Sequence, residues 1–338
     1  MRKKAGGAAV RRAHRHLSKG PRIVVVGGGS GLTPLLRGLK KYTSNLSAIV
    51  TVGDDGGSSG RLRRELGVPP PGDIRNCLVA LAEKEETMEA MLSYRFLSGD
   101  LSGHSLGNLI LAGLSEQYGD IRKAVEHLGR VFALRGQVYP ATLEDMTLKA
   151  TFSDGRIVRG ETALRETPGR ISRLAIEPED CAPLPEVLAA VRAADLIVLG
   201  PGSLFTSILP NLLVTELRRA LIEAPAPCLY VCNIMTEKGE TDGFTAADHL
   251  RVLAAHCGPN LVDVVLAARE EIDADVLRRY LAEGAVPVLP DAAAVEALGA
   301  RCLEASFDAG GAVVRHDPDK LAAVIIAAAP AGARRQRG

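Results

Sequence analysis

Short apolar runs that end in glycine-rich stretches recur along the chain. The first covers residues 23–26, Ile-Val-Val-Val, and three glycines follow it. Consecutive β-branched residues are typical of a strand that is buried on both faces. Residues 33–40 carry the pattern of a helix, which we expect to be entered through Pro34 in its first turn. A strand, a glycine turn and a helix in this order present backbone N–H groups to an anion.

The same pattern returns later in the chain. An apolar run at 194–199 leads into Gly-Pro-Gly-Ser and a helical stretch, and further strand-like runs cover 47–52, 228–233 and 261–266. Two strand–glycine–helix turns half a chain apart are what the two mononucleotide-binding halves of a doubly wound sheet produce, with both loops facing one crevice. We therefore predict an α/β protein with a Rossmann-like, three-layer α/β/α architecture and a mostly parallel sheet.

Residues 136–176 interrupt this pattern. Apolar and polar residues alternate here around an Asp-Gly turn, which indicates a hairpin, and 170–176 adds a third strand. We predict a small antiparallel β insertion within a single domain that covers residues 21–325. A disordered basic tail over 1–20 and a C-terminal tail over 326–338 are expected to flank this domain.

The composition indicates an aliphatic core and a chain that does not bind nucleic acid. Of the 338 residues, 46% are hydrophobic and none is tryptophan. The net charge of +1 divides into +8 over residues 1–22 and +3 over 334–337, which leaves −10 on the body between them. An acidic body argues against a nucleic-acid-binding face, because affinity for phosphates needs clustered lysine and arginine. We expect the basic ends to be solvated tails.

The sequence predicts neither a membrane span nor a zinc site. No stretch approaches the about 18 apolar residues of a membrane helix, and no apolar segment of a secretory signal precedes Pro21. The six cysteines are scattered through apolar sequence, without a second pair at zinc-ligand spacing. We therefore expect reduced thiols in a cytoplasmic protein that does not contact a membrane and holds no structural metal.

The glycine loops supply the first candidate site residues. The first loop lacks the third glycine of the dinucleotide fingerprint and the Gly-Lys-Ser/Thr of a P-loop, so a tight turn without a ligand stays open as an alternative. We expect both loops to bind a ligand. The candidates are Gly28, Gly29, Ser30, Gly31 and Leu32 in the first loop, and Gly200, Gly202 and Ser203 in the second.

Two acids follow the second predicted strand. Asp54 and Asp55 stand at the carboxyl end of that strand, where open parallel sheets bind their ligands. An acid at this position of a dinucleotide fold accepts a hydrogen bond from a ribose hydroxyl. Binding of Mg²⁺ and capping of a turn are the alternatives. We favour hydrogen bonding to the ligand, because small residues and then Arg61, Arg63 and Arg64 follow.

Further polar candidates lie in loops, at helix starts and at strand ends. His104 lies in a glycine-flanked loop, where it is placed to bind a phosphate or to act as a general acid, with helix capping as the alternative. Asn108 is better suited to anchor the backbone. The remaining candidates are Asp73 and Asn76, either of which is placed to cap a helix, and Asn233 and Thr236, which follow a strand.

Six motifs resemble, in family order, those of the YvcK-type gluconeogenesis factors. These belong to the same superfamily as 2-phospho-L-lactate transferase. The motifs span roughly residues 21–325 and read VVGGGSGL, VGDDGGSSGRLR, PPPGDIRN, SGHSLGNL, LGPGSLFTSILPNLLV and NIMTEKGETDGF. Ser30 stands where many members have threonine, and the hydroxyl is retained.

The resemblance implies a Rossmann-like cytoplasmic protein that binds UDP-sugars, above all UDP-N-acetylglucosamine, as a regulator without catalytic residues. Such proteins link carbon metabolism to cell-wall precursor synthesis and to cell shape, here through a regulated cytosolic enzyme that the sequence does not name. The resemblance adds Tyr280 and Arg315 to the candidate site, as residues that hold the nucleotide sugar. Three possibilities stay open: NAD binds as an alternative ligand, Mg²⁺ binds with the ligand, and the protein forms a homo-oligomer.

Two other functions compete with this interpretation. The first is a phosphotransferase similar to 2-phospho-L-lactate transferase. Transferase members continue after the two acids with an aromatic-containing segment and an SPDLDT-like run, where this chain has GGSSGRLR. The second is an NAD-dependent oxidoreductase, which the incomplete fingerprint disfavours. We therefore expect a non-catalytic sensor of a nucleotide sugar.

Overall fold

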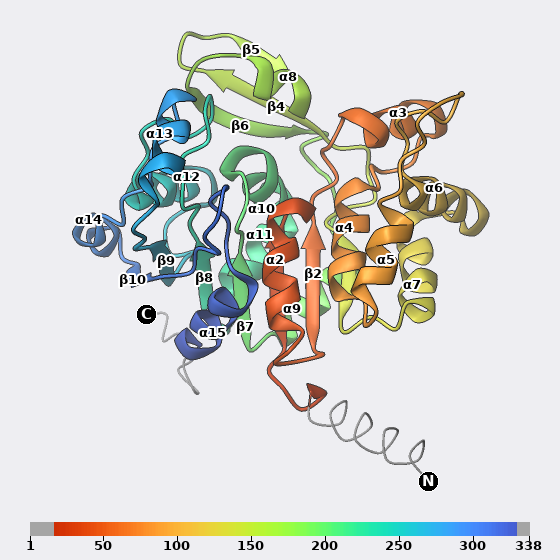
Figure 1. Ribbon diagram of the computed structural model, residues 1–338, viewed down its shortest axis with the longest axis horizontal. Coiled ribbons are helices and arrows are strands. Elements are labelled where there is room, and N and C mark those ends of the chain that lie inside the picture. Colours follow the sequence, from red (N-terminus) through yellow and green to blue (C-terminus); the bar gives the residue numbers. More distant parts are fainter. Residues whose placement is uncertain (1–16, 330–338) are drawn as a thin grey trace.

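The computed structural model describes residues 17–329, and within them a seven-stranded parallel sheet runs through the middle of the molecule (Figure 1). The strands lie in the order β10-β9-β8-β7-β1-β2-β3, and every neighbouring pair is parallel. Their bounds are β1 (Ile23–Gly27), β2 (Leu46–Val50), β3 (Gln137–Pro140), β7 (Leu196–Leu199), β8 (Cys228–Val231), β9 (Val264–Ala268) and β10 (Arg301–Ala305). The chain reverses direction across the sheet between β1 and β7, the switch point at which such sheets bind ligands.

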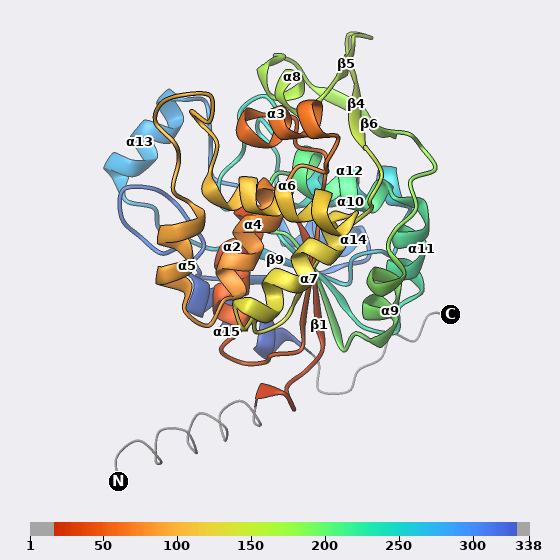
Figure 2. The ribbon, with the colours of Figure 1, turned by 90° about the vertical axis from the view of Figure 1, so that its right-hand side faces the viewer.

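Helices cover both faces of the sheet and complete the predicted three layers (Figure 2). One face carries α2 (Gly29–Leu39), α4 (Gly72–Leu81), α5 (Glu85–Leu92), α6 (Leu106–Tyr118), α7 (Ile121–Val131) and α15 (Pro318–Ala328). The other carries α9 (Pro185–Ala193), α10 (Leu209–Leu213), α11 (Thr215–Glu223), α12 (Ala246–Cys257) and α14 (Ala292–Ala297). The Rossmann-like fold class is confirmed.

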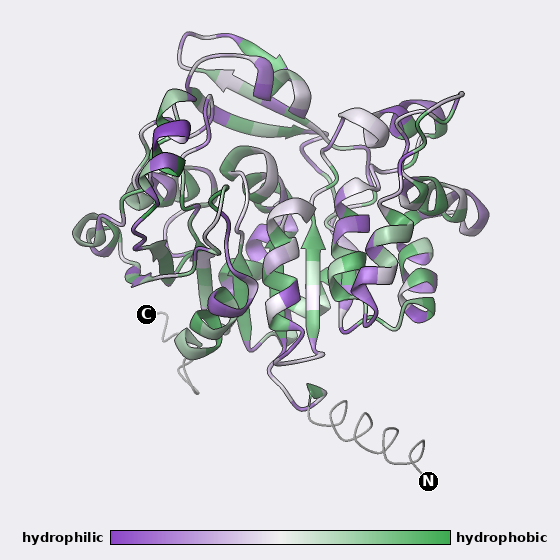
Figure 3. Ribbon diagram, in the orientation of Figure 1, coloured by the Kyte–Doolittle hydropathy of each residue, from purple (hydrophilic) through white to green (hydrophobic). Residues whose placement is uncertain are grey.

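The aliphatic strands form the core of the molecule. All residues of β1, β7, β8 and β9 are buried, because helices cover both faces of the sheet. Figure 3 shows this arrangement as mostly green, apolar strands in the middle of the molecule and helices whose turns are partly green and partly purple. Within residues 17–329, no helix has both the length and the apolar character needed to cross a bilayer. The six cysteines form no disulfide.

A second, antiparallel sheet lies over the carboxyl ends of the main strands (Figures 1 and 2). It contains β4 (Thr147–Phe152), β5 (Ile157–Arg159) and β6 (Ile171–Glu177) in the order β5-β4-β6, with α8 (Glu161–Glu166) between β5 and β6. We call residues 147–177 the cap. The alternating pattern of β4 places its even-numbered residues inward, which confirms the predicted hairpin.

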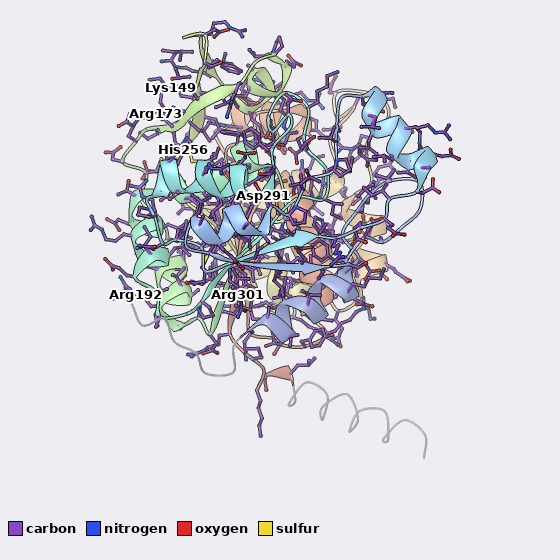
Figure 4. All side chains as sticks on the ribbon, turned by 90° about the vertical axis from the view of Figure 1, so that its left-hand side faces the viewer. Lys149, Arg173, Arg192, His256, Asp291 and Arg301 are labelled. Atoms are coloured by element: carbon purple, nitrogen blue, oxygen red, sulfur yellow. The ribbon has the colours of Figure 1, made fainter. Side chains whose placement is uncertain are left out.

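The cap is fastened to the body at α12. On the side of the molecule shown in Figure 4, His256 of α12 lies beneath Arg173 and Lys149 of the cap. The imidazole Nε2 of His256 accepts a hydrogen bond of 3.0 Å from the backbone N–H of Leu174, and its Nδ1 donates to the carbonyl of Val252 at 2.8 Å. One imidazole thus joins the edge strand of the cap to a helix of the body.

Several predicted boundaries differ from the structure. The insertion does not begin at 136, because residues 137–140 pair with β2 and extend the main sheet. The first helix begins at Gly29, so Pro34 lies inside it and not at its start. The strand β10 was not predicted, since it contains the charged residues Arg301 and Glu304 and is only partly buried at the edge of the sheet. The helix α15 continues to Ala328, and the rest of the expected tails, 1–16 and 330–338, lies outside the described residues.

The contact between α2 and α15 depends on the absence of a side chain at Gly38. A Cβ at this position would lie 1.9 Å from the carbonyl oxygen of Pro318 and 2.7 Å from the Cβ of Ala322. We expect Gly38→Ala to lower the free energy of unfolding by about 1–3 kcal/mol, because backbone must move to relieve the overlap. Denaturant titration measures this change.

Gly113 provides the matched control, since it lies within α6 and a Cβ there would meet nothing within 4 Å. Gly113→Ala should raise the free energy of unfolding by about 0.5–1 kcal/mol, because alanine favours the helix. If both substitutions stabilised the protein, the close approach of α2 to α15 would be wrong.

Candidate functional site

The two predicted glycine loops touch each other at the switch point. A Cβ on Gly31 would lie 2.1 Å from the carbonyl oxygen of Pro201 and 2.8 Å from the Cα of Gly202. Only glycine permits this approach, because any side chain at Gly31 would separate the loops. Gly200, which precedes this contact, has a φ of +79°. The expectation that both loops face one crevice is confirmed.

A cleft of about 590 Å³ opens beside this contact, and we call it the first compartment. It combines residues from the two glycine loops with residues that follow β8, lie on α13 (Ala274–Ala282) or precede α15. Its walls include apolar side chains as well as polar ones. The lining residues are Ser30, Gly31, Thr33, Pro34, Arg37, Pro201, Gly202, Asn233, Ile234, Met235, Thr236, Glu237, Tyr280, Val314, Arg315 and His316.

A second hollow of about 510 Å³ adjoins the first, and we call it the second compartment. Ser30, Gly31, Gly202 and Glu237 line both hollows, so the glycine contact forms the boundary between them. The additional lining residues of the second compartment are Arg165, Ser203, Ser207, Lys238 and Glu240. Arg165 belongs to α8, so the cap forms part of this wall.

The first turn of α2 is positioned by an acid from α4. The backbone N–H of Gly29 donates a hydrogen bond to Asp73, which therefore bonds to the start of α2 and does not cap its own helix as predicted. Gly28 lies so close to Asp73 that a Cβ would approach its carboxylate oxygen to 3.0 Å. Leu32 lines neither compartment, because its side chain is fully buried and its N–H donates to the carbonyl of Gly28 at 3.1 Å.

The second glycine loop is held by polar side chains on its far side. Ser203 caps the short helix η1 (Leu204–Ile208), its Oγ accepting a hydrogen bond of 3.0 Å from the N–H of Thr206, and its hydroxyl donates to Glu240. Asn233 accepts a hydrogen bond of 3.3 Å from the N–H of Gly202 and donates one of 2.8 Å to Glu237. These bonds fix the wall between the compartments.

The candidates from the later part of the chain also line the first compartment. The phenol oxygen of Tyr280 accepts a hydrogen bond of 3.2 Å from the N–H of Val314, which positions the next residue, Arg315. Arg315 is exposed and lines the cleft. Thr236 is fixed by two hydrogen bonds with the backbone of Val286, at 2.8 and 2.9 Å. The structure thus brings Asn233, Thr236, Tyr280 and Arg315 to the glycine loops.

The acid pair after β2 makes bonds within the protein. Asp55 accepts hydrogen bonds from the N–H of Thr162 at 2.9 Å and from its hydroxyl at 2.6 Å, so it caps α8 from a distance. Asp54 accepts from the N–H of Gly56 at 2.9 Å, as in the predicted turn. Neither acid lines a compartment. Within residues 17–329, no group of three or more His, Cys, Asp or Glu side chains is placed to hold a metal ion. A hydrogen bond from Asp54 or Asp55 to a ligand stays a prediction.

His104, Asn76 and Asn108 belong to a separate buried network. Arg75 donates to Asn108 at 3.0 Å and to Asn76 at 2.8 Å, while the hydroxyl of Ser58 lies 3.0 Å from the Nδ1 of His104 and accepts from Asn108 at 3.1 Å. None of these residues lines either compartment. Burial, and then the nearby Arg61, lower the pKa of His104. The imidazole of His104 thus contacts α3 (Gly57–Leu66) at Ser58, and its predicted role at the ligand site stays a prediction.

Comparison with known proteins identifies the family. The family model of 2-phospho-L-lactate transferase CofD matches residues 23–307. The chain belongs to this family. Gluconeogenesis factors of Bacillus subtilis and Halalkalibacterium halodurans are 47% and 46% identical to it, over 90% and 91% of this chain and 97% and 96% of their own. A crystal structure of a UPF0052 family member from Bacillus halodurans aligns at 46% identity with a TM-score of 0.87, covering 90% of this chain and 99% of that chain.

The motifs therefore identified the family correctly, but sequence reasoning missed Arg165 and Glu161 in this CofD-family protein. They lie on α8, where Arg165 pairs with Glu161 at 2.7 Å and donates to Thr206 at 3.2 Å. Burial raises the pKa of Glu161 to about 8, although Arg165 opposes the shift. Burial also raises the pKa values of Asp73 and Glu237, with the Glu240 carboxylate adding to the effect at Glu237. No motif marks α8, which follows a hairpin that reads as an ordinary insertion.

The raised pKa of Glu161 predicts a pH dependence of stability. Between its ordinary value of 4.5 and about 8, folded Glu161 holds a proton that the unfolded chain has lost, so the free energy of unfolding falls as pH rises through this range and levels off above it. Glu161→Gln removes this contribution. We expect the variant to gain stability relative to the wild-type protein as pH rises from about 5 to about 8.

Denaturant unfolding at several pH values measures the difference. Glu166→Gln is the control, because Glu166 lies on the same helix and is exposed. A difference between wild type and Glu161→Gln that stays constant across this pH range would contradict the prediction.

Proposed function

We propose that this CofD-family protein is a gluconeogenesis factor that binds a nucleotide sugar, UDP-N-acetylglucosamine, in the first and second compartments and acts as a regulator. The observation that carries the proposal is the contact of Gly31 with Pro201 and Gly202, which joins two strand–glycine–helix turns in one cleft at the switch point. Ligands of doubly wound sheets bind at this position.

The electrostatics of the first compartment suit a diphosphate. Asp73 takes the N–H of Gly29 in the first turn of α2, and the turn has further N–H groups without partners in the helix. The helix dipole favours an anion beside them. Arg315 lines the same compartment as Ser30 and Gly31 of this turn, and its planar guanidinium can donate two parallel hydrogen bonds to a phosphate. Arg37 also lines the compartment, where Glu85 and Glu89 hold its guanidinium.

The walls of the first compartment suit a single small ring. Tyr280 provides a phenol face, and Pro34, Ile234 and Val314 provide apolar surface. Tyr280 is the only phenylalanine, tyrosine or tryptophan among the described residues that line it. A uracil finds enough contact area here, whereas a three-ring deazaflavin would have one ring on which to stack.

We further propose that the bound nucleotide sugar is not converted by the protein but controls its activity as a regulator. In this view the protein reports the level of UDP-N-acetylglucosamine to a cytosolic enzyme, and so links carbon metabolism to cell-wall precursor synthesis and cell shape. The relatives named gluconeogenesis factor, at 46–47% identity, support the metabolic part of this proposal. A homo-oligomer is part of the same proposal and nucleic acid is not, given the acidic body of the chain.

The alternative is a phosphotransferase similar to 2-phospho-L-lactate transferase. The family match and the buried carboxyl groups of Asp73 and Glu161 near the cleft favour it, because carboxyls with raised pKa values are common where protons are transferred. Parallel calorimetric titrations with UDP-N-acetylglucosamine, NAD and a deazaflavin, with and without Mg²⁺, separate the two. Preferential binding of the deazaflavin would overturn the proposal in favour of the transferase.

Arg315 provides a direct test of the nucleotide-sugar site. We expect Arg315→Ala to weaken the affinity for UDP-N-acetylglucosamine by about 10- to 100-fold, since a charge-assisted bond to phosphate is lost. The midpoint of thermal unfolding should stay unchanged, because the side chain is exposed. Isothermal titration and a thermal melt measure the two quantities.

Arg301→Ala is the matched control, since Arg301 is an exposed arginine on β10 and lines neither compartment (Figure 4). Equal affinity of Arg315→Ala and wild type would remove Arg315 from the site.

A further inference from the structure

The two compartments differ in chemistry. Apolar side chains, among them Ile234, Met235 and Val314, form part of the first compartment. The second is lined by serine, lysine, arginine, glutamate and glycine alone, among the residues that the structure describes. A planar base gains from apolar walls, whereas a hydroxylated group needs a hydrogen-bond partner in every direction.

We propose that the second compartment is the subsite for the hexose of a nucleoside diphosphate sugar. The base then lies in the first compartment beside Tyr280, and the diphosphate crosses the contact between Gly31 and Gly202. This inference rests on the proposed function and assigns the orientation of its ligand. The volume of about 510 Å³ is ample for a hexose with an N-acetyl group.

The side chains of the second compartment match a sugar in hydrogen-bonding capacity. Each hydroxyl of a hexose both donates and accepts. Glu237 and Glu240 accept, Lys238 and Arg165 donate, and Ser207 does both. The guanidinium of Arg165 has five N–H donors. It bonds to Glu161 and to Thr206, and its remaining N–H groups are left for the ligand.

The charges of this compartment favour a neutral group over a second anion. Two cations, Arg165 and Lys238, share the wall with Glu237 and Glu240. Burial raises the pKa values of both acids, so their carboxyl groups can donate a hydrogen bond in the protonated form and accept one in the charged form. A phosphate would gain affinity from lysine and arginine alone, whereas the hydroxyls of a hexose find donors and acceptors together.

The test compares UDP with UDP-N-acetylglucosamine by isothermal titration. The wild-type protein should bind the sugar nucleotide about tenfold or more tightly than UDP, because the hexose adds hydrogen bonds. Lys238→Ala should weaken the affinity for the sugar nucleotide by about tenfold while changing the affinity for UDP less than about twofold, since Lys238 is exposed and lines the second compartment but not the first. Lys238→Gln, which keeps most of the length of the side chain and loses its charge, serves as the second variant.

Arg315→Ala is a control for the nucleotide site. It should weaken the affinity for UDP and the affinity for UDP-N-acetylglucosamine by the same factor. Equal affinities of the wild type for the two ligands would overturn the sugar subsite and leave the nucleotide site standing. A loss of UDP affinity in Lys238→Ala as large as the loss of affinity for the sugar nucleotide would also overturn it. If the wild type bound neither ligand, the proposed function would fail and this inference with it.

Discussion

The close packing of α2 is the constraint on which the site depends. Three glycines of this helix face backbone atoms of three different segments: Gly29 faces Asp73, Gly31 faces Pro201 and Gly38 faces Pro318, and a Cβ would approach those atoms to 2.4, 2.1 and 1.9 Å. The glycines therefore act through their small size. They let the helix after the first strand contact α4, the second glycine loop and α15 at once. Both compartments share the residues at the middle contact, so the geometry of the whole cleft follows from it.

Two acids bond to helix starts, and one of them, Asp55, connects the cap to the body. Asp73 bonds to the first turn of α2, and Asp55 bonds to the first turn of α8 through Thr162. Each acid meets unpaired backbone N–H groups and the positive end of a helix dipole. The bond of Asp55 holds α8 over the carboxyl ends of the strands, and this places Arg165 at the second compartment. The bond from Asp55, which follows β2, thus places the short helix α8 of the cap beside the switch point.

The predictable part of the protein is the part governed by local pattern. The buried strands β1, β7 and β8 are continuous apolar runs, and the turns after β1 and β7 contain the glycines that mark them. Asp55 and His104 illustrate what the pattern leaves open. A loop acid and a loop imidazole look like ligand contacts in a sequence, yet their partners, Thr162 and Ser58, are 107 and 46 residues away. Whether such a side chain bonds to a ligand or to a distant residue of the chain depends on how the cap and α3 pack, which local pattern does not determine.

The buried carboxyl groups around the cleft lower the free energy of unfolding. Burial disfavours their charged form, which raises the pKa of Glu161 to about 8 and also raises those of Glu237 and Glu240. Apolar residues of similar volume would fill the same space without this penalty. Arg165 offsets part of the penalty, because its guanidinium lowers the pKa of all three. Acids that are buried beside one shared cation, in a cleft at the switch point, are typical of a binding or catalytic site and not of a core. The buried acids thus lower stability around the cleft, and the aliphatic sheet beneath it supplies the hydrophobic stabilisation that offsets them.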